Sequence, residues 1–138
     1  MTLSRGQRAV ITDASVAVRF LLGERAWFAA WRTWIEDGAA VLVPAHFAHE
    51  VANALVRSVR LSAVDATLKV GRLFRTGFAI ADRGLSGIEG SIELAERHRL
   101  SIYDAAYLDL ALDVDGELAT LDTALRAAAE AEGVALLG

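Results

Sequence analysis

Short, nearly all-apolar runs alternate along the chain with longer segments in which apolar residues recur at helical spacing. The apolar runs predict five strands, at residues 9–12, 40–43, 78–81, 117–120 and 134–137. The helical periods predict seven helices, at residues 16–22, 27–35, 46–60, 62–75, 86–98, 102–112 and 123–131. Three residue pairs have the spacing of capping boxes at helix N-termini: Ser62 with Asp65, Ser86 with Glu89, and Ser101 with Asp104.

This alternation is typical of an α/β fold with a parallel sheet, because right-handed helical crossovers connect parallel strands. The expected strands are apolar on both faces, which indicates that helices cover both sides of the sheet. We therefore expect a three-layer α/β/α sandwich in which residues 1–138 form one domain. Ligands of such folds bind outside the carboxyl ends of the strands, so polar residues at those ends are the first candidates for a site.

Composition adds limits on the cellular setting. The chain has no cysteine, which favours a reducing compartment, and residues 1–7 lack the apolar run of a signal peptide. No stretch is apolar enough to predict a membrane span, so we expect a cytoplasmic protein. The net charge of −4 argues against simple electrostatic binding to nucleic acid, although 13 of the 14 basic residues are arginine, which suits phosphate partners.

Four acidic residues are placed where they could share one edge of the sheet. Asp13 follows the first expected strand, Asp104 opens the sixth expected helix, and Asp122 follows the fourth strand. Glu50 lies in the helix after the second strand and reaches that edge only if its helix packs back across it. Each acid also has an ordinary alternative, because Asp13, Asp104 and Asp122 could cap helices and Glu50 could be a surface residue.

The apolar surroundings of Asp13 and Glu50 favour a joint role for the acids. Desolvated carboxylates that lie close together repel one another, so they persist only with a cation. Hard oxygen ligands select Mg²⁺, with Mn²⁺ as a possible substitute. Carboxylates that hold Mg²⁺ at a dry edge are suited to phosphodiester hydrolysis.

Four motifs in order resemble those of PIN-domain nucleases, and the nearest subgroup is the VapC-type toxin of type II toxin–antitoxin pairs. The first is Val10-Ile-Thr-Asp13-Ala-Ser15-Val16, and the second runs from Pro44 through Glu50 to Leu55. The third is Ser101-Ile-Tyr-Asp104-Ala-Ala-Tyr107, and the fourth is Leu118-Ala-Thr120-Leu-Asp122, followed by Leu125 and Val134. The resemblance extends from Ala9 to Leu137.

The resemblance implies a parallel five-stranded sheet and a Mg²⁺-dependent endoribonuclease that hydrolyses RNA by metal-activated water, leaving a 5′-phosphate and a 3′-hydroxyl. It also implies a homodimer and a VapB-type antitoxin partner. Asp13 and Asp104 would be the chief metal ligands, with Glu50 and Asp122 completing the acidic set. Ser15 and Thr120 match hydroxyl positions that would hold carboxylates or waters, although a helix cap or a strand position would explain them equally well.

Other polar and aromatic residues have plainer expectations. His46 and His49 precede Glu50 without the spacing of a zinc protease helix, so we expect partly buried histidines, with a substrate contact left open for His49. Asp109 should point away from Asp104, about 140° around their helix. Trp27, Trp31 and Trp34 recur at helical spacing, which indicates core packing or, in part, a partner surface.

Three other functions share some of these features. A signalling receiver domain has a similar fold and an acidic pocket, but it needs a lysine late in the chain, and Lys69 lies mid-helix. A non-catalytic RNA-binding or scaffold domain would not need all four acids. A structure-specific nuclease acting on DNA would use the same chemistry on another substrate. The target RNA itself depends on loop shape and base contacts that no spacing rule predicts.

Overall fold

The computed structural model describes residues 3–138 and has a five-stranded, all-parallel sheet at its centre. The strand order is β3-β2-β1-β4-β5. The strands are β1 (Ala9–Thr12), β2 (Ala40–Val43), β3 (Ala79–Ile80), β4 (Glu117–Ala119) and β5 (Leu136–Leu137). This arrangement confirms the predicted fold class.

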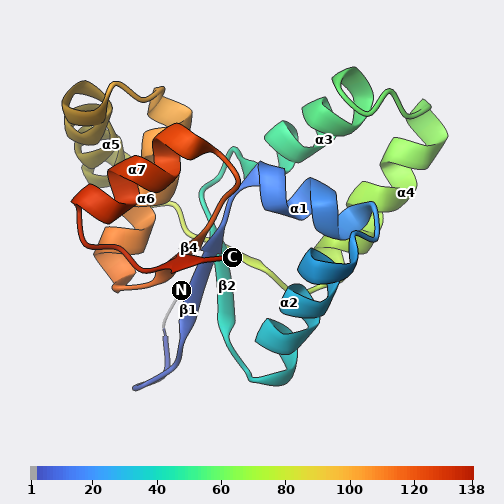
Figure 1. Cartoon of the computed structure of the whole chain (residues 1–138), viewed down its shortest axis with the longest axis horizontal. Coiled ribbons are helices and arrows are strands. Elements are labelled where there is room, and N and C mark those ends of the chain that lie inside the picture. The colour runs from blue at the N-terminus through green and yellow to red at the C-terminus, as the bar shows by residue number, and fades with distance from the viewer. Residues whose placement is uncertain (1–2) are drawn as a thin grey trace.

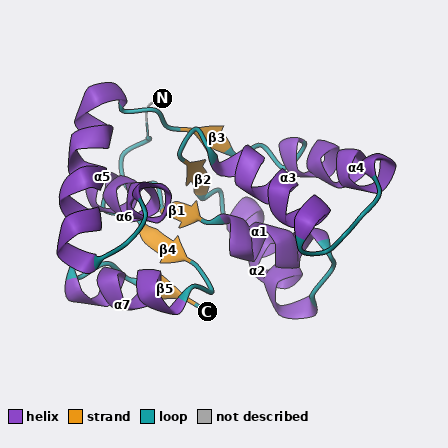
Figure 2. Cartoon of the chain, turned by 90° about the horizontal axis from the view of Figure 1, so that it is seen from above, coloured by secondary structure: helices purple, strands orange, loops and turns teal. Residues whose placement is uncertain are grey.

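Helices cover both faces of the sheet (Figures 1 and 2). One layer contains the first part of the chain: α1 (Ala14–Leu21), α2 (Arg25–Glu36), α3 (Phe47–Arg57) and α4 (Ala63–Phe74). The other layer contains α5 (Gly84–His98), α6 (Ile102–Val114) and α7 (Thr123–Ala131). Within residues 3–138, no helix is long and apolar enough to cross a membrane.

The strand order places β1 in the middle of the sheet, between β2 and β4. The chain therefore builds outward from β1 to β3 and then returns to the other side of β1 with β4. The register pairs Thr12 with Ala119, so the carboxyl ends of β1 and β4 lie side by side. This order also differs from the 2-1-3-4-5 order of receiver-type folds, which removes that alternative.

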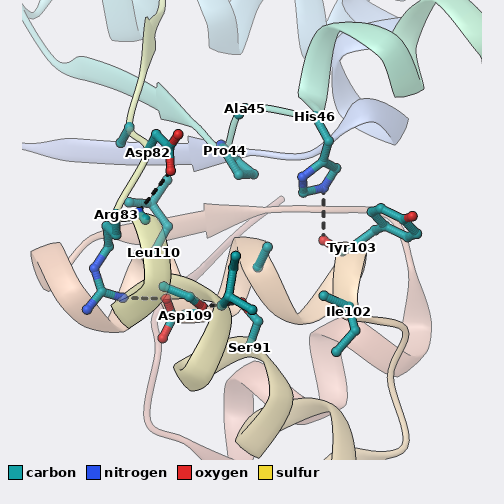
Figure 3. Close-up of a pocket in the computed structure, with 15 residues that line it drawn as sticks. Pro44, Ala45, His46, Asp82, Arg83, Ser91, Ile102, Tyr103, Asp109 and Leu110 are labelled. Atoms are coloured by element: carbon teal, nitrogen blue, oxygen red, sulfur yellow. Dashed lines mark hydrogen bonds and ion pairs between the residues drawn. The ribbon is translucent and has the colours of Figure 1, made fainter.

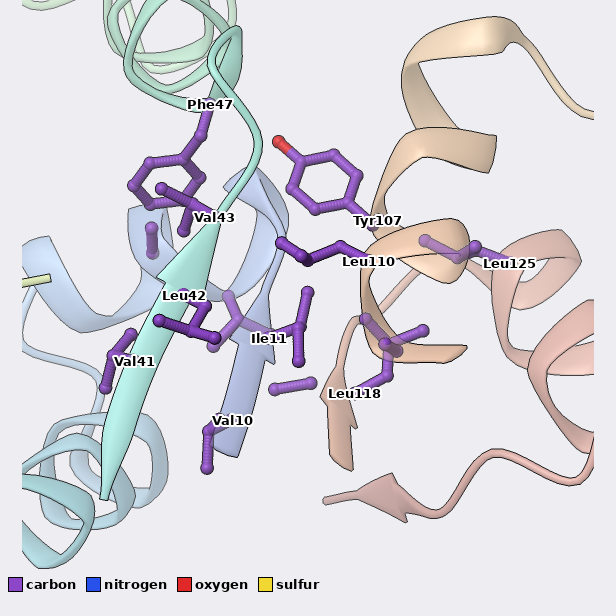
Figure 4. Close-up of a cluster of buried hydrophobic side chains, with 14 of the residues drawn as sticks. Val10, Ile11, Val41, Leu42, Val43, Phe47, Tyr107, Leu110, Leu118 and Leu125 are labelled. Atoms are coloured by element: carbon purple, nitrogen blue, oxygen red, sulfur yellow. The ribbon is translucent and has the colours of Figure 1, made fainter. Parts of the chain in front are cut away.

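The core lies on both sides of the central strands (Figure 4). Ile11, Leu42 and Leu118 are fully buried, and Leu108 and Leu125 from the helical layer behind them are fully buried too. Every residue of β1 is buried, as expected for a central strand with helices on both faces. These contacts hold the strand ends, and the residues that follow them, in fixed positions.

The tryptophans belong to the core. Trp27, Trp31 and Trp34 of α2 are all buried, so the prediction of core packing is confirmed and the idea of a partner surface on these rings is wrong. Trp31 is completely buried and stacks on Phe20 of α1, with ring centroids 4.5 Å apart. The stacking of Trp31 on Phe20 thus holds α2 against α1.

Two of the three predicted serine N-caps are confirmed and one is wrong. Ser62 and Ser101 each accept a hydrogen bond from a backbone N–H three residues later. Ser86 lies inside α5, which begins at Gly84, because the Asp82 side chain accepts from the Gly84 N–H and turns the chain two residues earlier. The third helix is also shorter than predicted, ending at Arg57 rather than residue 60.

The packing of α5 against α6 requires a small residue at Gly90. A Cβ atom at this position would overlap the carboxylate of Asp109 on α6. Arg83 holds that carboxylate by an ion pair and also lies 3.2 Å from Asp113. The carboxylate therefore cannot move aside without breaking its ion pair.

Gly90→Ala is expected to lower the free energy of unfolding by about 1–3 kcal/mol, because the added methyl overpacks this contact. Urea denaturation measures the change. Gly71→Ala in α4 is the matched control, since its Cβ would meet only the flexible end of Arg75 at 3.5 Å. That variant should be more stable by about 0.5–1 kcal/mol, as alanine favours a helix over glycine. Equal responses of the two variants would contradict the packing argument.

Candidate active site

The four predicted acids come from four connections that meet at the carboxyl edge of the sheet. Asp13 directly follows β1 and is the N-cap of α1, and Asp122 is the N-cap of α7 after β4. Asp104 lies in the first turn of α6. Glu50 lies in the first turn of α3, which begins at Phe47. Asp13 and Asp122 therefore cap helices and also belong to this group of four acids, Asp13, Glu50, Asp104 and Asp122, which we call the acidic edge.

Asp13 is the most enclosed of the four, with only 6% of its surface exposed. Its Oδ1 accepts hydrogen bonds from the Ser15 hydroxyl at 2.6 Å and from the Val16 N–H at 3.2 Å. Its Oδ2 accepts from the hydroxyl of Thr120, which follows the neighbouring strand β4. Both carboxylate oxygens are thus held, and the two hydroxyl residues singled out in the sequence both contact this one group.

Ser15 and Thr120 also join the two strand ends to each other. The Ser15 hydroxyl oxygen accepts from the Leu121 N–H at 3.0 Å, and the Thr120 hydroxyl oxygen accepts from the Asp122 N–H at 3.0 Å. A chain of hydrogen bonds therefore runs from Asp13 to the segment that presents Asp122. Side chains locked in this way present a carboxylate with little freedom to rotate.

Burial raises the pKa of Asp13 above its ordinary value, although the hydrogen bonds from Ser15, Thr120 and Val16 oppose that rise. Burial also raises the pKa of Asp104, and the negative charges of Asp122, Glu50 and Asp13 raise it further. This electrostatic coupling shows that the other three acids act on Asp104. The edge is therefore a region of concentrated, partly desolvated negative charge.

Glu50 points toward α6. Its Oε1 accepts a hydrogen bond from the Tyr107 hydroxyl at 2.6 Å and lies 3.2 Å from Nε2 of His46. Burial tends to raise the pKa of Glu50, but these two donors outweigh it and lower the pKa below its ordinary value. The helix α3 thus packs back across the edge, as a role for Glu50 requires. The buried Tyr107 hydroxyl was missed in the sequence, although its spacing of three residues from Asp104 places it on the same helix face.

Asp104→Asn is expected to stabilise the metal-free protein by up to about 1 kcal/mol, or about 4 °C in Tm, because it removes a charge that its neighbours repel. The raised pKa means that Asp104 destabilises the fold progressively as pH rises from its ordinary pKa of 3.8 through its folded value. The Tm advantage of the variant should therefore grow as the pH rises from about 4 and level off above the folded pKa, which buffers between about pH 4 and pH 7 can follow. Thermal unfolding in EDTA measures it.

Asp37→Asn is the control for this experiment, because Asp37 is exposed at the end of α2, away from the acidic edge. Its Tm should follow that of the parent chain at each pH. If the Tm of Asp104→Asn minus that of the parent is constant or negative across this pH range, the repulsion between the acids is negligible.

The edge has the donor chemistry for a hard divalent cation. Within residues 3–138, no three acidic or histidine side chains converge on one point as a ready-made metal cage. Mg²⁺ usually takes one or two protein carboxylates and keeps several of its waters, so it does not need such a cage. Oxygen donors and uncompensated negative charge at Asp13 and Asp104 fit that mode of binding.

Two residues near the edge in sequence lie outside it. Asp109 binds Arg83 and does not join the other acids, as its angle around α6 from Asp104 predicted, and Asp113 in α6 binds the same arginine. A mostly apolar cavity of about 270 Å³ lies beside this ion pair (Figure 3). His46 and Tyr103 line it, but none of the four acids does. His49 is exposed.

Comparisons with known proteins agree with this fold. The family model of the PIN domain matches residues 10–131. No curated protein sequence matches the chain. The solved structure of PAE2754 from Pyrobaculum aerophilum is similar, with a TM-score of 0.72 and 20% identity over 94% of this chain and 83% of the other.

Two further similar structures are described by their roles. VapC20 from Mycobacterium tuberculosis, a toxin that cleaves the sarcin–ricin loop, has a TM-score of 0.68 and 19% identity, covering 86% of this chain and 94% of its own. VapBC2 from Rickettsia felis, bound to a DNA fragment from its promoter, has a TM-score of 0.70 and 12% identity, covering 94% and 97%. At these identities the likeness shows a shared fold.

Proposed function

The chain belongs to the PIN domain family, and from that premise we propose that it is a Mg²⁺-dependent endoribonuclease, the toxin component of a toxin–antitoxin pair. The observation that carries the proposal is the acidic edge. Asp13 is buried there, and the charges of Asp122, Glu50 and Asp13 raise the pKa of Asp104. Such a group of carboxylates is costly for folding and is well suited to holding a cation against a phosphodiester.

The residues at the acidic edge would have two roles, binding the cation and orienting the carboxylates that bind it. Asp13 and Asp104 would hold the cation directly, with Asp122 and Glu50 contacting it or its waters. Ser15 and Thr120 keep the Asp13 carboxylate in one orientation, and Tyr107 does the same for Glu50. A bound Mg²⁺ supplies neutralisation of the phosphate charge and a lowered pKa for a coordinated water. Mn²⁺ would serve in the same way.

Structured RNA is the substrate that we propose. The similar toxin VapC20 cleaves an RNA loop, and sequence-specific recognition of RNA commonly targets the unpaired bases of loops. That mode suits a chain with a net charge of −4, whose basic residues are nearly all arginine.

The test is incubation of the purified chain with structured RNA in Mg²⁺ or Mn²⁺, with EDTA as the control. We expect internal cleavage that leaves a 5′-phosphate and a 3′-hydroxyl, and no cleavage in EDTA. A parallel reaction contains DNA of the same sequence. Cleavage of the DNA but not of the RNA would mean that DNA is the substrate. Cleavage in EDTA would contradict metal dependence.

We also propose a VapB-type antitoxin partner and a homodimer. One similar structure is a toxin–antitoxin complex from Klebsiella pneumoniae, with a TM-score of 0.64 and 19% identity over 83% of this chain and 87% of that one. Large apolar side chains are exposed on several helices, among them Val64 and Leu68 on α4 and Leu85 and Ile88 on α5. Neighbouring exposed apolar side chains of this kind favour contact with protein partners.

A short antitoxin reading frame directly upstream would support the pairing, and its product should bind the chain and stop RNA cleavage. Light scattering of the purified chain gives its mass, which should be that of two copies. A monomer would contradict the homodimer, and the lack of an antitoxin frame would weaken the toxin role while leaving the nuclease intact. The cytoplasm is the compartment we propose for this activity, since its RNA is there.

A further inference from the structure

The imidazole of His46 lies between two of the acid-bearing helices (Figure 3). His46 is the N-cap residue of α3, the helix that carries Glu50. Its Nε2 is 3.1 Å from the backbone carbonyl oxygen of Tyr103, the residue before Asp104, and 3.2 Å from Oε1 of Glu50. One ring nitrogen therefore contacts both the Glu50 carboxylate and the first turn of α6.

The partners of this nitrogen determine its role. A backbone carbonyl can only accept a hydrogen bond, and so can an ionised carboxylate. Nε2 of His46 must therefore carry the hydrogen and donate it to both oxygens. This holds whichever state Nδ1 is in, so the contact does not depend on the ionisation of the ring.

The Tyr107 hydroxyl donates to the same oxygen of Glu50, Oε1, at 2.6 Å. Among residues 3–138 no hydrogen bond to Oε2 of Glu50 is found, so the second oxygen is left available. Tyr107 lies three residues after Asp104 and thus on the same face of α6. Two donors fix one oxygen of Glu50 and leave the other for a ligand at the acidic edge.

Aromatic contacts hold the His46 ring itself in place. Tyr103 and Tyr107 both contact it edge-on, with ring centroids 5.4 Å and 5.2 Å away and interplanar angles of 64° and 71°. Tyr107 is fully buried and cannot easily move. The imidazole is thus pre-oriented, so its hydrogen bonds need little ordering when a ligand binds.

We infer that His46 is a positioning residue that ties the start of α3 to the first turn of α6 and so sets where Glu50 presents its Oε2 beside Asp104. The inference rests on the proposed function, because the position of Glu50 matters only if the acidic edge binds a cation. His46 acts through Glu50 and touches neither the cation nor the RNA. Tyr107 connects the same two helices through its own hydrogen bond to Glu50.

Three variants at position 46 test the inference. His46→Leu removes the donor at similar volume. His46→Gln keeps a donor at the place of Nε2, whereas the shorter His46→Asn has its amide nearer the place of Nδ1. Mn²⁺ binding is measured by electron paramagnetic resonance titration of the free protein, and RNA cleavage gives kcat and KM.

We expect His46→Leu and His46→Asn to bind Mn²⁺ about 10-fold more weakly, the usual effect of losing a partner that orients a metal ligand. Their kcat should fall at fixed Mn²⁺ concentration, with KM for RNA unchanged. His46→Gln should restore both values to near those of the parent chain. Leu and Asn variants that bind Mn²⁺ like the parent would overturn the inference, and so would a Gln variant as weak as the Leu variant.

His98→Leu is the matched control. His98 also donates to a glutamate across two helices, with its Nε2 2.6 Å from Oε2 of Glu132. Glu132 follows α7 at the end opposite Asp122, so this pair is remote from the acidic edge. The control should keep the Mn²⁺ affinity of the parent even if its Tm falls, and a loss of Mn²⁺ affinity equal to that of His46→Leu would show that general loosening explains the effect.

The same measurements separate the two proposals. A parent chain that neither binds Mn²⁺ nor cleaves RNA overturns the proposed function, and this inference with it. A parent chain that does both, beside a His46→Leu variant that does them equally well, overturns the role of His46 alone. The Tm of each variant shows that the comparison is made between folded proteins.

Discussion

Asp13→Asn is expected to cleave RNA at least about 10³-fold more slowly than the parent chain while remaining folded, the scale seen when an essential group of a catalytic set is removed. Asp13 is the acid that the fold encloses most completely, and its two oxygens are held by Ser15 and Thr120. The substitution keeps the size of the side chain and an acceptor for the α1 cap, and it removes the negative charge. Cleavage of structured RNA at saturating Mg²⁺ measures the effect.

Asp37→Asn is the control, since it makes the same chemical change at an exposed position after α2. It should cleave at the rate of the parent. Circular dichroism and Tm show whether each variant is folded. Cleavage by Asp13→Asn at more than a tenth of the parent rate would remove Asp13 from the catalytic set and undermine the assignment of the acidic edge.

The largest effect on stability is expected from Trp31→Ala, which should lower the free energy of unfolding by about 3–5 kcal/mol. Trp31 is completely buried and stacks on Phe20 at 4.5 Å between ring centroids. Its loss removes apolar contact area and leaves a cavity between α1 and α2 that the surrounding rings fill only in part. A domain of this size has a total stability of about 5–15 kcal/mol, so the variant should be marginally folded.

Arg32→Ala is the control for Trp31→Ala, because the next residue along α2 points to solvent. Its ion pair with Glu36 is exposed on both sides, so the expected change is within about 0.5 kcal/mol. Urea denaturation followed by tryptophan fluorescence measures both variants. A loss below about 1 kcal/mol for Trp31→Ala would mean that the α1–α2 contact is not part of the rigid core.

The central part of the fold could be predicted closely from the sequence. The strands predicted at residues 9–12 and 40–43 have the observed boundaries. An inner strand is covered on both faces, so its apolar run marks its full length. The edge strands β3 and β5 were predicted at four residues and have two. An edge strand has one neighbour, so the length of its pairing depends on that neighbour and not on its own apolar run.

The sequence indicated which residues belong to the candidate site, but only some of the contacts between them. Strand ends and motif spacing indicated the four acids, Ser15 and Thr120. Periodicity carries no information on how α3 crosses the edge, so the contacts of Glu50 with Tyr107 and His46 could not be foreseen. The sequence rules did not indicate the roles of two residues, the buried Tyr107 and the histidine at the start of α3, His46.

The hydrogen bond between Thr120 and Asp13 joins residues 107 positions apart in the chain. Closing so long a loop is slow compared with forming local helices, so β4 should join β1 late in refolding. A partly folded chain that has assembled only its first half carries Asp13 and Glu50 without Asp104 and Asp122. The proposed nuclease activity should therefore return only with the last stage of refolding, well after the helical signal, so that an incompletely folded chain should leave RNA intact.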